Sequence, residues 1–335
     1  MLHPHGGPYA SSHERAHYSN HARQPHEFRL TQTDTAPVGD RDQLTRFLIE
    51  TAGVRGVRVH LADTWTQVLE RAEYPQAAAE LLGEALAASA AFTGHAKIDG
   101  RLSVQLRGHG ALRTLFAECT AAGTLRGIAQ IDEDAGTVSR DLRDLGSGAL
   151  LAITIENPSL DGREPMRYQG LVGLEADSLA GAFEDYFRQS EQLPTRLLLA
   201  ADERQAAALL LQKLPGDHGD DDGWSRVGAL FDTLTTRELL EWSAEDLLTR
   251  LFHEDGVQVL GQKPLRFACS CSRERVESML VSLGEAEAEA AVEAAGGVAQ
   301  IRCEFCGHSY RFDAKEIASL FAVATTELAA PDRVQ

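Results

Sequence analysis

The sequence is poor in cysteine and in aromatic residues, and it has no long apolar run. Five cysteines in 335 residues are too few for a secreted fold built on disulfides. No run of eighteen apolar residues occurs, so no segment is predicted to span a membrane. Lys and Arg total 32 against 50 Asp and Glu, and the charge of −18 disfavours nucleic acid as a partner. The apolar content of 43% is that of an ordinary globular protein.

Residues 1–27 are predicted to form a disordered tail, because they hold turn formers and six of the twelve histidines but almost no periodic apolar residues. His13, Glu14 and His17 match the H-E-x-x-H pattern of zinc proteases. That chemistry needs a rigid, partly buried helix, so we interpret the match as chance. The tail also lacks an apolar signal core, which favours a cytoplasmic protein with reduced thiols.

The pattern that follows predicts an α+β fold with a strand-rich N-terminal core domain. Val57, Val59 and Leu61 alternate as in a half-buried strand, and a helix is expected over 75–92. Four further alternating stretches precede a capped amphipathic helix over 177–189. Strands grouped between helices favour an antiparallel or mixed sheet. Cys119 lies on one of these strands and is predicted to be a core residue.

The chain is predicted to continue as a helical linker region and a small C-terminal zinc-binding domain. The expected divisions are a His-rich tail over 1–27, the core domain over 28–200, the linker region with an acidic loop over 201–262, the zinc-binding redox-switch domain over 263–325, and a disordered tail over 326–335. The acidic run from Asp217 to Asp222 lacks the glutamate that a calcium loop places at its twelfth position, so we interpret it as a solvated loop.

Two or three short helices are expected between Trp224 and Glu254. Thr235 with Glu238 has the pattern of a capping box, and Ser243 is a second candidate cap. These helices carry many leucines. Their apolar surface is expected either to pack on a neighbouring domain or to serve as a hidden binding surface, and the sequence leaves both readings open.

Four cysteines late in the chain form two pairs, which predict a zinc site. Cys269-Ser-Cys271 is followed, after thirty-one residues, by Cys303-Glu-Phe-Cys306. Four thiolates complete a tetrahedral Zn²⁺ shell, although C-x-C is unusual in a structural zinc ribbon. His308 is a candidate substitute ligand that ranks behind Cys306.

The surroundings of these cysteines indicate how the metal affects stability. Four nearby arginines are candidates to offset the negative charge of a Zn(Cys)₄ centre: Arg266, Arg273, Arg275 and Arg302. Ser272 is expected to cap a helix to about Leu283, and Asp313 with Glu316 is expected to open a final helix to about Phe321. Such a small domain has only a few kcal/mol of its own, whereas structural zinc contributes about 10 to 16 kcal/mol. Removal of zinc is therefore expected to unfold it.

Three segments together resemble the heat shock protein 33 family of redox-regulated chaperones. They are the run from Phe267 to Arg275, the run from Cys303 to Phe312, and the stretch Glu184-Asp-Tyr-Phe-Arg-Gln-Ser-Glu-Gln-Leu-Pro-Thr195. The resemblance covers about residues 40 to 325. The His-rich tail and the acidic loop depart from the family pattern, and they leave any additional function of those parts open.

The resemblance implies a chaperone that holds unfolding proteins without ATP and is not an enzyme. Oxidants would convert the zinc-bound thiolates to two disulfides, Cys269 with Cys271 and Cys303 with Cys306, and the active form would be a homodimer. The chemistry is consistent with this, because oxidation of a ligand expels the metal. A bridge between Cys269 and Cys271 would close a small, strained ring that is easily reduced. The chain has no P-loop, and Gly146-Ser-Gly148 lacks the third glycine of a dinucleotide loop.

Two other classes of function remain as alternatives. A nucleic-acid-binding regulator with a zinc ribbon would use the same cysteines, but the charge of −18 disfavours it. A thiol-disulfide oxidoreductase would use Cys303 and Cys306. It is disfavoured because a catalytic C-x-x-C normally begins a helix and has no second cysteine pair bound through zinc.

Overall fold

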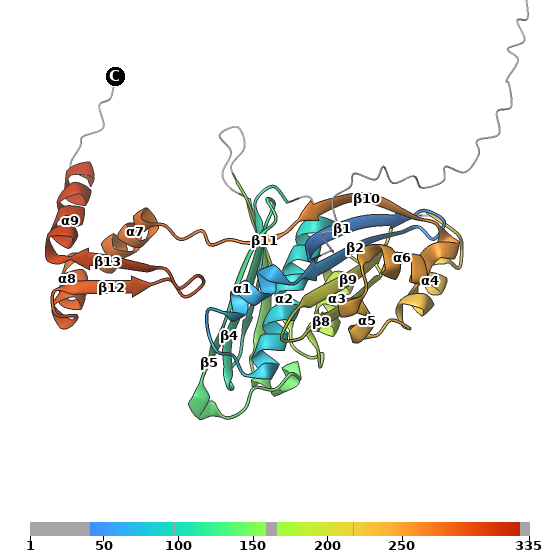
Figure 1. Cartoon of the computed structure of the whole chain (residues 1–335), viewed down its shortest axis with the longest axis horizontal. Coiled ribbons are helices and arrows are strands. Elements are labelled where there is room, and N and C mark those ends of the chain that lie inside the picture. Colours follow the sequence, from blue (N-terminus) through green and yellow to red (C-terminus); the bar gives the residue numbers. More distant parts are fainter. Residues whose placement is uncertain (1–40, 97, 159–165, 217, 329–335) are drawn as a thin grey trace, which may run out of the picture. The chain divides into compact units, whose positions relative to one another are not determined.

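The computed structural model describes residues 41–96, 98–158, 166–216 and 218–328. These residues form a five-stranded sheet, a six-stranded sheet and a two-stranded sheet, together with helices (Figure 1). The predicted tail of residues 1–27, with its H-E-x-x-H match, lies outside the described residues. None of the helices in the described ranges is long and apolar enough to cross a membrane.

The five-stranded sheet joins the beginning of the described chain to segments much later in the sequence. Its order is β10 (Val257–Pro264), β1 (Asp42–Ile49), β2 (Val54–Leu61), β9 (Ala206–Lys213) and β8 (Thr195–Ala201). All its neighbouring strands are antiparallel. The sheet therefore extends into residues 201–262, which the sequence predicts to be a linker region.

The six-stranded sheet is mixed, which is one of the two arrangements that the sequence predicts. Its order is β11 (Arg266–Phe267), β5 (Thr124–Ile131), β4 (Leu112–Thr120), β3 (Arg101–Arg107), β6 (Leu150–Asn157) and β7 (Met166–Gly173). The short pairing of β11 with β5 is parallel, and the other neighbours are antiparallel. Within the ranges that the structure describes, three short 3-10 helices lie at Glu133–Ala135, Leu142–Leu145 and His253–Asp255.

The main hydrophobic core lies around one long helix. Helix α2 (Gln76–His95) contacts strands of both sheets, and α1 (Asp63–Leu69) and α3 (Leu179–Ser190) complete the layer. Its alanines suit this position because they favour helix and have little bulk. Six of them are fully buried: Ala78, Ala85, Ala87, Ala88, Ala90 and Ala91. A Cβ on Gly83 would lie 2.6 Å from that of Ala201, so glycine permits the close approach of β8.

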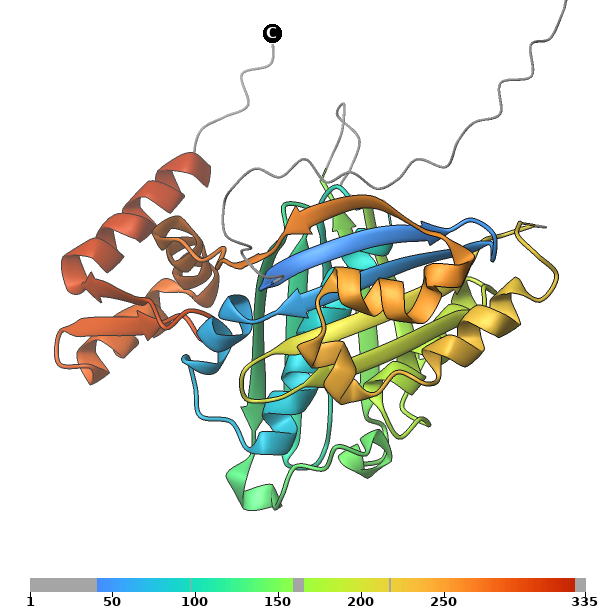
Figure 2. The same ribbon diagram turned by 45° about the vertical axis from the view of Figure 1, so that its right-hand side comes forward.

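Three helices cover the opposite face of the five-stranded sheet. These are α4 (Gly223–Phe231), α5 (Thr236–Glu241) and α6 (Ala244–Phe252), which we call the linker helices, coloured yellow to orange in Figure 2. They share a second core with the sheet, formed from sheet residues such as Phe47, Ile49, Leu209 and Leu211 and from helix residues such as Val227, Phe231, Leu247, Leu251 and Phe252. Their apolar surface is thus packed on the sheet.

The structure contains the helix caps that the sequence predicts in the linker region. Thr235 and Glu238 form the predicted capping box, and the Ser243 side chain accepts a hydrogen bond from the Asp246 N–H. Of the predicted acidic loop, Asp220 and Asp222 both pair with Arg226. Asp217 lies outside the described residues.

The C-terminal region is a small unit with its own core. It contains α7 (Arg273–Leu283), α8 (Glu285–Ala294), β12 (Val298–Arg302), β13 (Ser309–Asp313) and α9 (Ala314–Leu328). Seven buried residues make this core: Leu280, Ala288, Val292, Ala299, Tyr310, Phe312 and Ile317. Helix α9 continues past the predicted end at Phe321, because no glycine or proline interrupts the chain before Pro331. Residues 326–328 of the predicted tail are therefore helical.

Candidate metal centre

Two loops of the C-terminal region carry the four clustered cysteines. Cys269 and Cys271 lie between β11 and α7, and the Ser272 side chain begins α7 by accepting the Arg275 N–H. Cys303 and Cys306 lie in the turn between β12 and β13. That turn is closed by the bond from the Gly307 N–H to the Cys303 carbonyl, with Gly307 at φ +72°. The positive φ favours glycine at the position directly after the last cysteine.

The four sulfur atoms come together as the sequence predicts. All of them lie within 4.8 Å of one another. The Sγ atoms of Cys269 and Cys303 are 3.7 Å apart, and those of Cys271 and Cys306 are 3.3 Å apart. A tetrahedral ion with sulfur ligands at about 2.3 Å separates them by about 3.8 Å, so the cluster has the size of a Zn(Cys)₄ site. Each of these two distances joins a cysteine of the first pair to a cysteine of the second, and the geometry does not itself select a disulfide pairing.

The electrostatics of the cluster also favour a cation. Burial raises the pKa of the Cys306 thiol to about 12, and the neighbouring sulfurs act in the same direction. Four thiolates this close together repel one another, and a divalent cation supplies the compensating charge. The donor set therefore fits a soft or borderline metal ion, which would be held by Cys269, Cys271, Cys303 and Cys306.

Two residues that follow the second cysteine pair complete the surroundings of the sulfurs: His308, directly before β13, and Tyr310, on β13. The Tyr310 hydroxyl donates a hydrogen bond to Cys271 Sγ at 3.2 Å, and this contact raises the pKa of Tyr310 to about 12. The ring of His308 packs against that of Tyr310 with centroids 4.6 Å apart. His308 is not part of the four-residue cluster, so the proposed substitute ligand has a packing contact instead.

The nearby arginines mainly bind other groups. Arg273 pairs with Glu277 and Glu316, and Arg275 binds the carbonyl and hydroxyl of Ser270, which fixes the loop between the first two cysteines. Another cation, which the sequence did not indicate, lies near a sulfur. Burial of Arg126 on β5 lowers its pKa, but Glu118 and, after it, Cys269 outweigh this and raise it.

Phe305 connects the second cysteine pair to the six-stranded sheet. It lies between Cys303 and Cys306, and the guanidinium of Arg126 lies 4.5 Å from its ring centroid. Its ring also meets that of Phe116 at 5.6 Å. An aromatic residue inside a C-x-x-C loop is a visible signal, but its partners on β4 and β5 can be known only from the fold.

Cys119 lies apart from the cluster. Its side chain is buried in the main core, and burial raises its pKa to about 12. Among the described residues it belongs to no group of metal-ligating side chains. The prediction that it is a core residue is confirmed.

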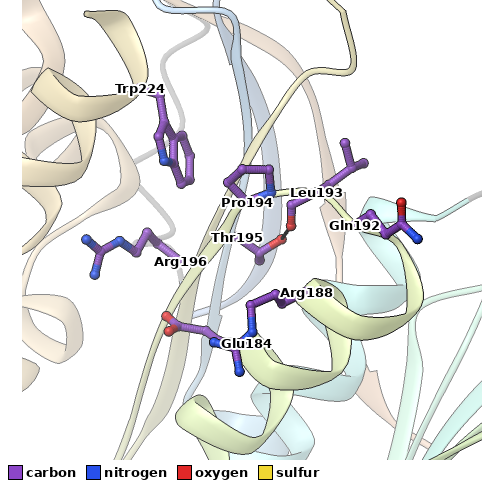
Figure 3. A pocket seen from close by; sticks show the side chains of 8 residues that line it. All are labelled: Glu184, Arg188, Gln192, Leu193, Pro194, Thr195, Arg196 and Trp224. Carbon is purple, nitrogen blue, oxygen red and sulfur yellow. Dashed lines mark hydrogen bonds between the residues drawn. The ribbon is translucent and has the colours of Figure 1, made fainter.

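A pocket of about 390 Å³ lies beside the segment Gln192–Thr195 (Figure 3). The nearby arginines Arg188 and Arg196 pair with Asp185 and Asp232. Both arginines of the pocket are therefore already engaged in ion pairs. We therefore place the chemistry of the protein at the cysteine cluster.

The fold and this cluster define a class of protein: a strand-rich α+β core followed by a small unit whose four cysteines can hold one metal ion. The family model described as Hsp33 protein matches residues 42–313. The chain belongs to the Hsp33 family, and the resemblance found in the sequence is confirmed.

Individual relatives agree with this assignment. The chain is 45% identical over 287 residues to a protein named 33 kDa chaperonin from Ectopseudomonas mendocina, a match that covers 84% of this chain and 96% of the relative. It is 43% identical to the 33 kDa chaperonin of Azotobacter vinelandii, with 85% and 96% covered. The crystal structure of a 33 kDa chaperonin from Thermotoga maritima has a TM-score of 0.69 at 20% identity and covers 85% of this chain and 99% of its own. That structure supports the same fold.

Proposed function

We propose that this chain is a redox-regulated chaperone that holds unfolding proteins without ATP and prevents their aggregation under oxidative stress. Membership of a family of chaperones supports the general role. The observation that carries the redox proposal is the cluster of four sulfurs within 4.8 Å, in a unit with a small core of its own. One Zn²⁺ per chain would bind there in the reduced form and supply most of the stability of that unit.

Oxidation of the cysteines would switch the protein on. Hydrogen peroxide takes two electrons and two protons from a pair of thiols, which leaves one disulfide and two water molecules. We propose that Cys269 pairs with Cys271 and Cys303 with Cys306. A cysteine in a disulfide is no longer a thiolate ligand, so the site loses its metal and the C-terminal unit its main source of stability.

The linker helices supply the surface that such a switch would open. They join β9 to β10, and β10 leads through β11 directly to Cys269. They cover apolar residues of the five-stranded sheet, among them Phe47 and Leu211. Unfolding of the C-terminal unit would remove one anchor of this segment, and both its leucines and the sheet face would become available to unfolded clients.

Further parts of the proposal follow from the same reading. The protein would act in the cytoplasm, would bind neither membrane nor nucleic acid, and would be a homodimer when oxidised. An oxidoreductase is disfavoured, because Cys303 and Cys306 lie in a strand-to-strand turn and not at the start of a helix. We therefore propose that the protein is not an enzyme.

An aggregation assay tests the proposal. A thermally unfolding client is heated with reduced, zinc-loaded protein or with peroxide-treated protein, and light scattering is followed. We expect only the oxidised sample to suppress aggregation of the client. Reduction of that sample with dithiothreitol, before the client is added, should abolish the suppression. Equal suppression by both samples would show that the chaperone is not controlled by redox state.

A further inference from the structure

The four sulfurs of the cluster differ in their hydrogen-bond partners. Tyr310 lies on β13 with only 9% of its surface exposed, and its hydroxyl donates to Cys271 Sγ at 3.2 Å. Within the described residues, no other side-chain hydroxyl reaches a sulfur of the cluster. The Tyr310 contact is therefore an individual feature of Cys271 that a single substitution can delete.

Tyr310 is held firmly enough for this contact to persist. Its ring belongs to the small C-terminal core and packs edge-on against His308. Its backbone pairs with Ile301 in the β12–β13 ladder. The hydroxyl is thus presented to the sulfur by a strand, and not by a mobile surface side chain.

A hydrogen bond to a thiolate reduces the reactivity of the sulfur. The O–H group draws on the same lone-pair density that attacks an oxidant, and nucleophilicity falls with the basicity of the sulfur. Peroxide chemistry requires that density in its first step. The thiolate attacks one oxygen of hydrogen peroxide, the O–O bond breaks, and a sulfenic acid and hydroxide form. A second thiolate then attacks the sulfenic sulfur, which gives the disulfide and a second hydroxide.

We propose that Tyr310 is a positioning residue that sets the oxidant threshold of the cluster by keeping Cys271 a poor nucleophile toward peroxide. This inference rests on the proposed redox function and adds a residue to it. Cys271 would be protected from weak oxidation, and the site would still respond to stronger oxidation. The tyrosine would thereby prevent oxidation of the cluster under resting conditions and allow it under oxidative stress.

The test compares the full-length zinc-loaded protein with Tyr310→Phe, which keeps the buried ring and removes only the hydroxyl. Loss of a hydrogen bond to a charged sulfur raises its basicity, and nucleophilicity follows basicity with a slope of about 0.4 to 0.5. We therefore expect Cys271 in the variant to react with hydrogen peroxide several-fold faster. Pulsed alkylation with mass spectrometry measures the loss of each thiol, and a chromogenic chelator records the zinc released.

A matched control separates reactivity from structural loosening. Ser309→Ala changes the preceding residue, whose exposed hydroxyl bonds to Gln300 and touches no sulfur, and it should leave all four rates unchanged. Simple loosening in Tyr310→Phe would accelerate all four cysteines together, and so overturn the inference. An unchanged Cys271 rate in the variant, with normal oxidation of the wild type, overturns the inference alone. A wild-type cluster that keeps its zinc and its thiols in peroxide overturns both this inference and the proposed function.

Discussion

Arg58 donates a hydrogen bond from its guanidinium to the backbone carbonyl of Trp242, at a distance of 2.5 Å. Arg58 lies on β2 and is 1% exposed, whereas Trp242 follows directly after α5. His60, two residues further along β2, makes a similar contact with the Leu240 carbonyl at 3.2 Å. The linker helices are therefore held to the sheet by buried polar contacts as well as by apolar packing. A carbonyl at a helix end needs such a donor when it is buried.

The first prediction follows from this contact. Arg58→Met removes the donor and leaves the Trp242 carbonyl without it, which should weaken the docking of α5 by about 1.5 to 3 kcal/mol. Hydrogen exchange of residues 236–252 should become correspondingly faster, with strand β3 unchanged. Arg237→Met is the control, because Arg237 is an exposed residue that pairs within its own helix with Glu241, and it should change little. Unaltered protection in Arg58→Met would mean that this hydrogen bond does not contribute to the docking of the helices.

The second prediction concerns the metal. Purified reduced protein should contain one zinc per chain, and Cys271→Ser or Cys306→Ser should bind it far more weakly, because a thiolate ligand is lost. Elemental analysis after dialysis against a mild chelator gives the metal content. Full zinc retention in both variants would rule out the four-cysteine site.

The third prediction concerns Cys119. Its raised pKa and burial keep it as an unreactive thiol. Cys119→Ala should therefore show normal zinc content and normal oxidative activation, with only a modest loss of stability. Chemical denaturation and the aggregation assay check the two parts. A folded variant that no longer responds to peroxide would contradict a scheme with only two disulfides.

The fourth prediction is a dependence of stability on pH through His95. Burial lowers the pKa of His95 to about 4, Arg55 adds to this, and a hydrogen bond with Gln212 opposes it. As the pH falls, the unfolded chain, with a histidine pKa near 6.5, takes up a proton before the folded protein does. The contribution of neutral His95 to folding stability is therefore fully present above about pH 6.5 and is lost as the pH falls toward 4. Between pH 7 and 5 we expect a loss of about 1 to 2 kcal/mol from this group.

The comparison variant for this prediction is His95→Gln. It removes the titrating ring and keeps a polar side chain beside Gln212. Urea unfolding at pH 7, 6 and 5 should show a smaller loss of stability in the variant than in the wild type. Parallel curves would show that His95 does not control this range.

The fifth prediction addresses the switch itself. Oxidised protein should exchange rapidly over 273–321 and over 224–252, because the first segment loses its metal and the second loses an anchor. Protection over Val57–Leu61 should stay as in the reduced form. The measurement is hydrogen exchange with mass spectrometry on reduced and oxidised samples. Client holding by an oxidised sample with both segments protected would exclude unfolding as the mechanism.

Much of the core could be predicted from sequence because its signals are local. The alternation around Val57 becomes β2, and the alanine-rich stretch after Pro75 becomes α2. Strands β7 and β10 were not predicted, and both lie at sheet edges. Leu171 on β7 is 62% exposed and Leu260 on β10 is 51% exposed, so neither strand has a clear buried face to produce alternation. The pairing of β10 with β1 is a long-range contact that no local pattern encodes.

The metal centre, too, could be predicted from the sequence only in part. Its four cysteines are visible because ligand spacing is a property of the chain. Tyr310 and Arg126 act through position: the first reaches Cys271 because β13 folds back on β12, and the second interacts with Cys269 from the core sheet. Neither spacing nor charge distinguishes them from other tyrosines and arginines of the chain.

The two residues of β11 have a consequence for self-association. Arg266 and Phe267 pair with Thr124 and Leu125, and Cys269 follows two residues later. If this stretch loses order with the metal unit, β5 becomes an open edge along its whole length, with a row of backbone N–H and C=O groups facing outward. Open edges attract other extended chains by strand addition. The unit that responds to oxidants is therefore joined to the short strand that pairs with the beginning of this edge, and loss of that strand would lengthen the open part of β5.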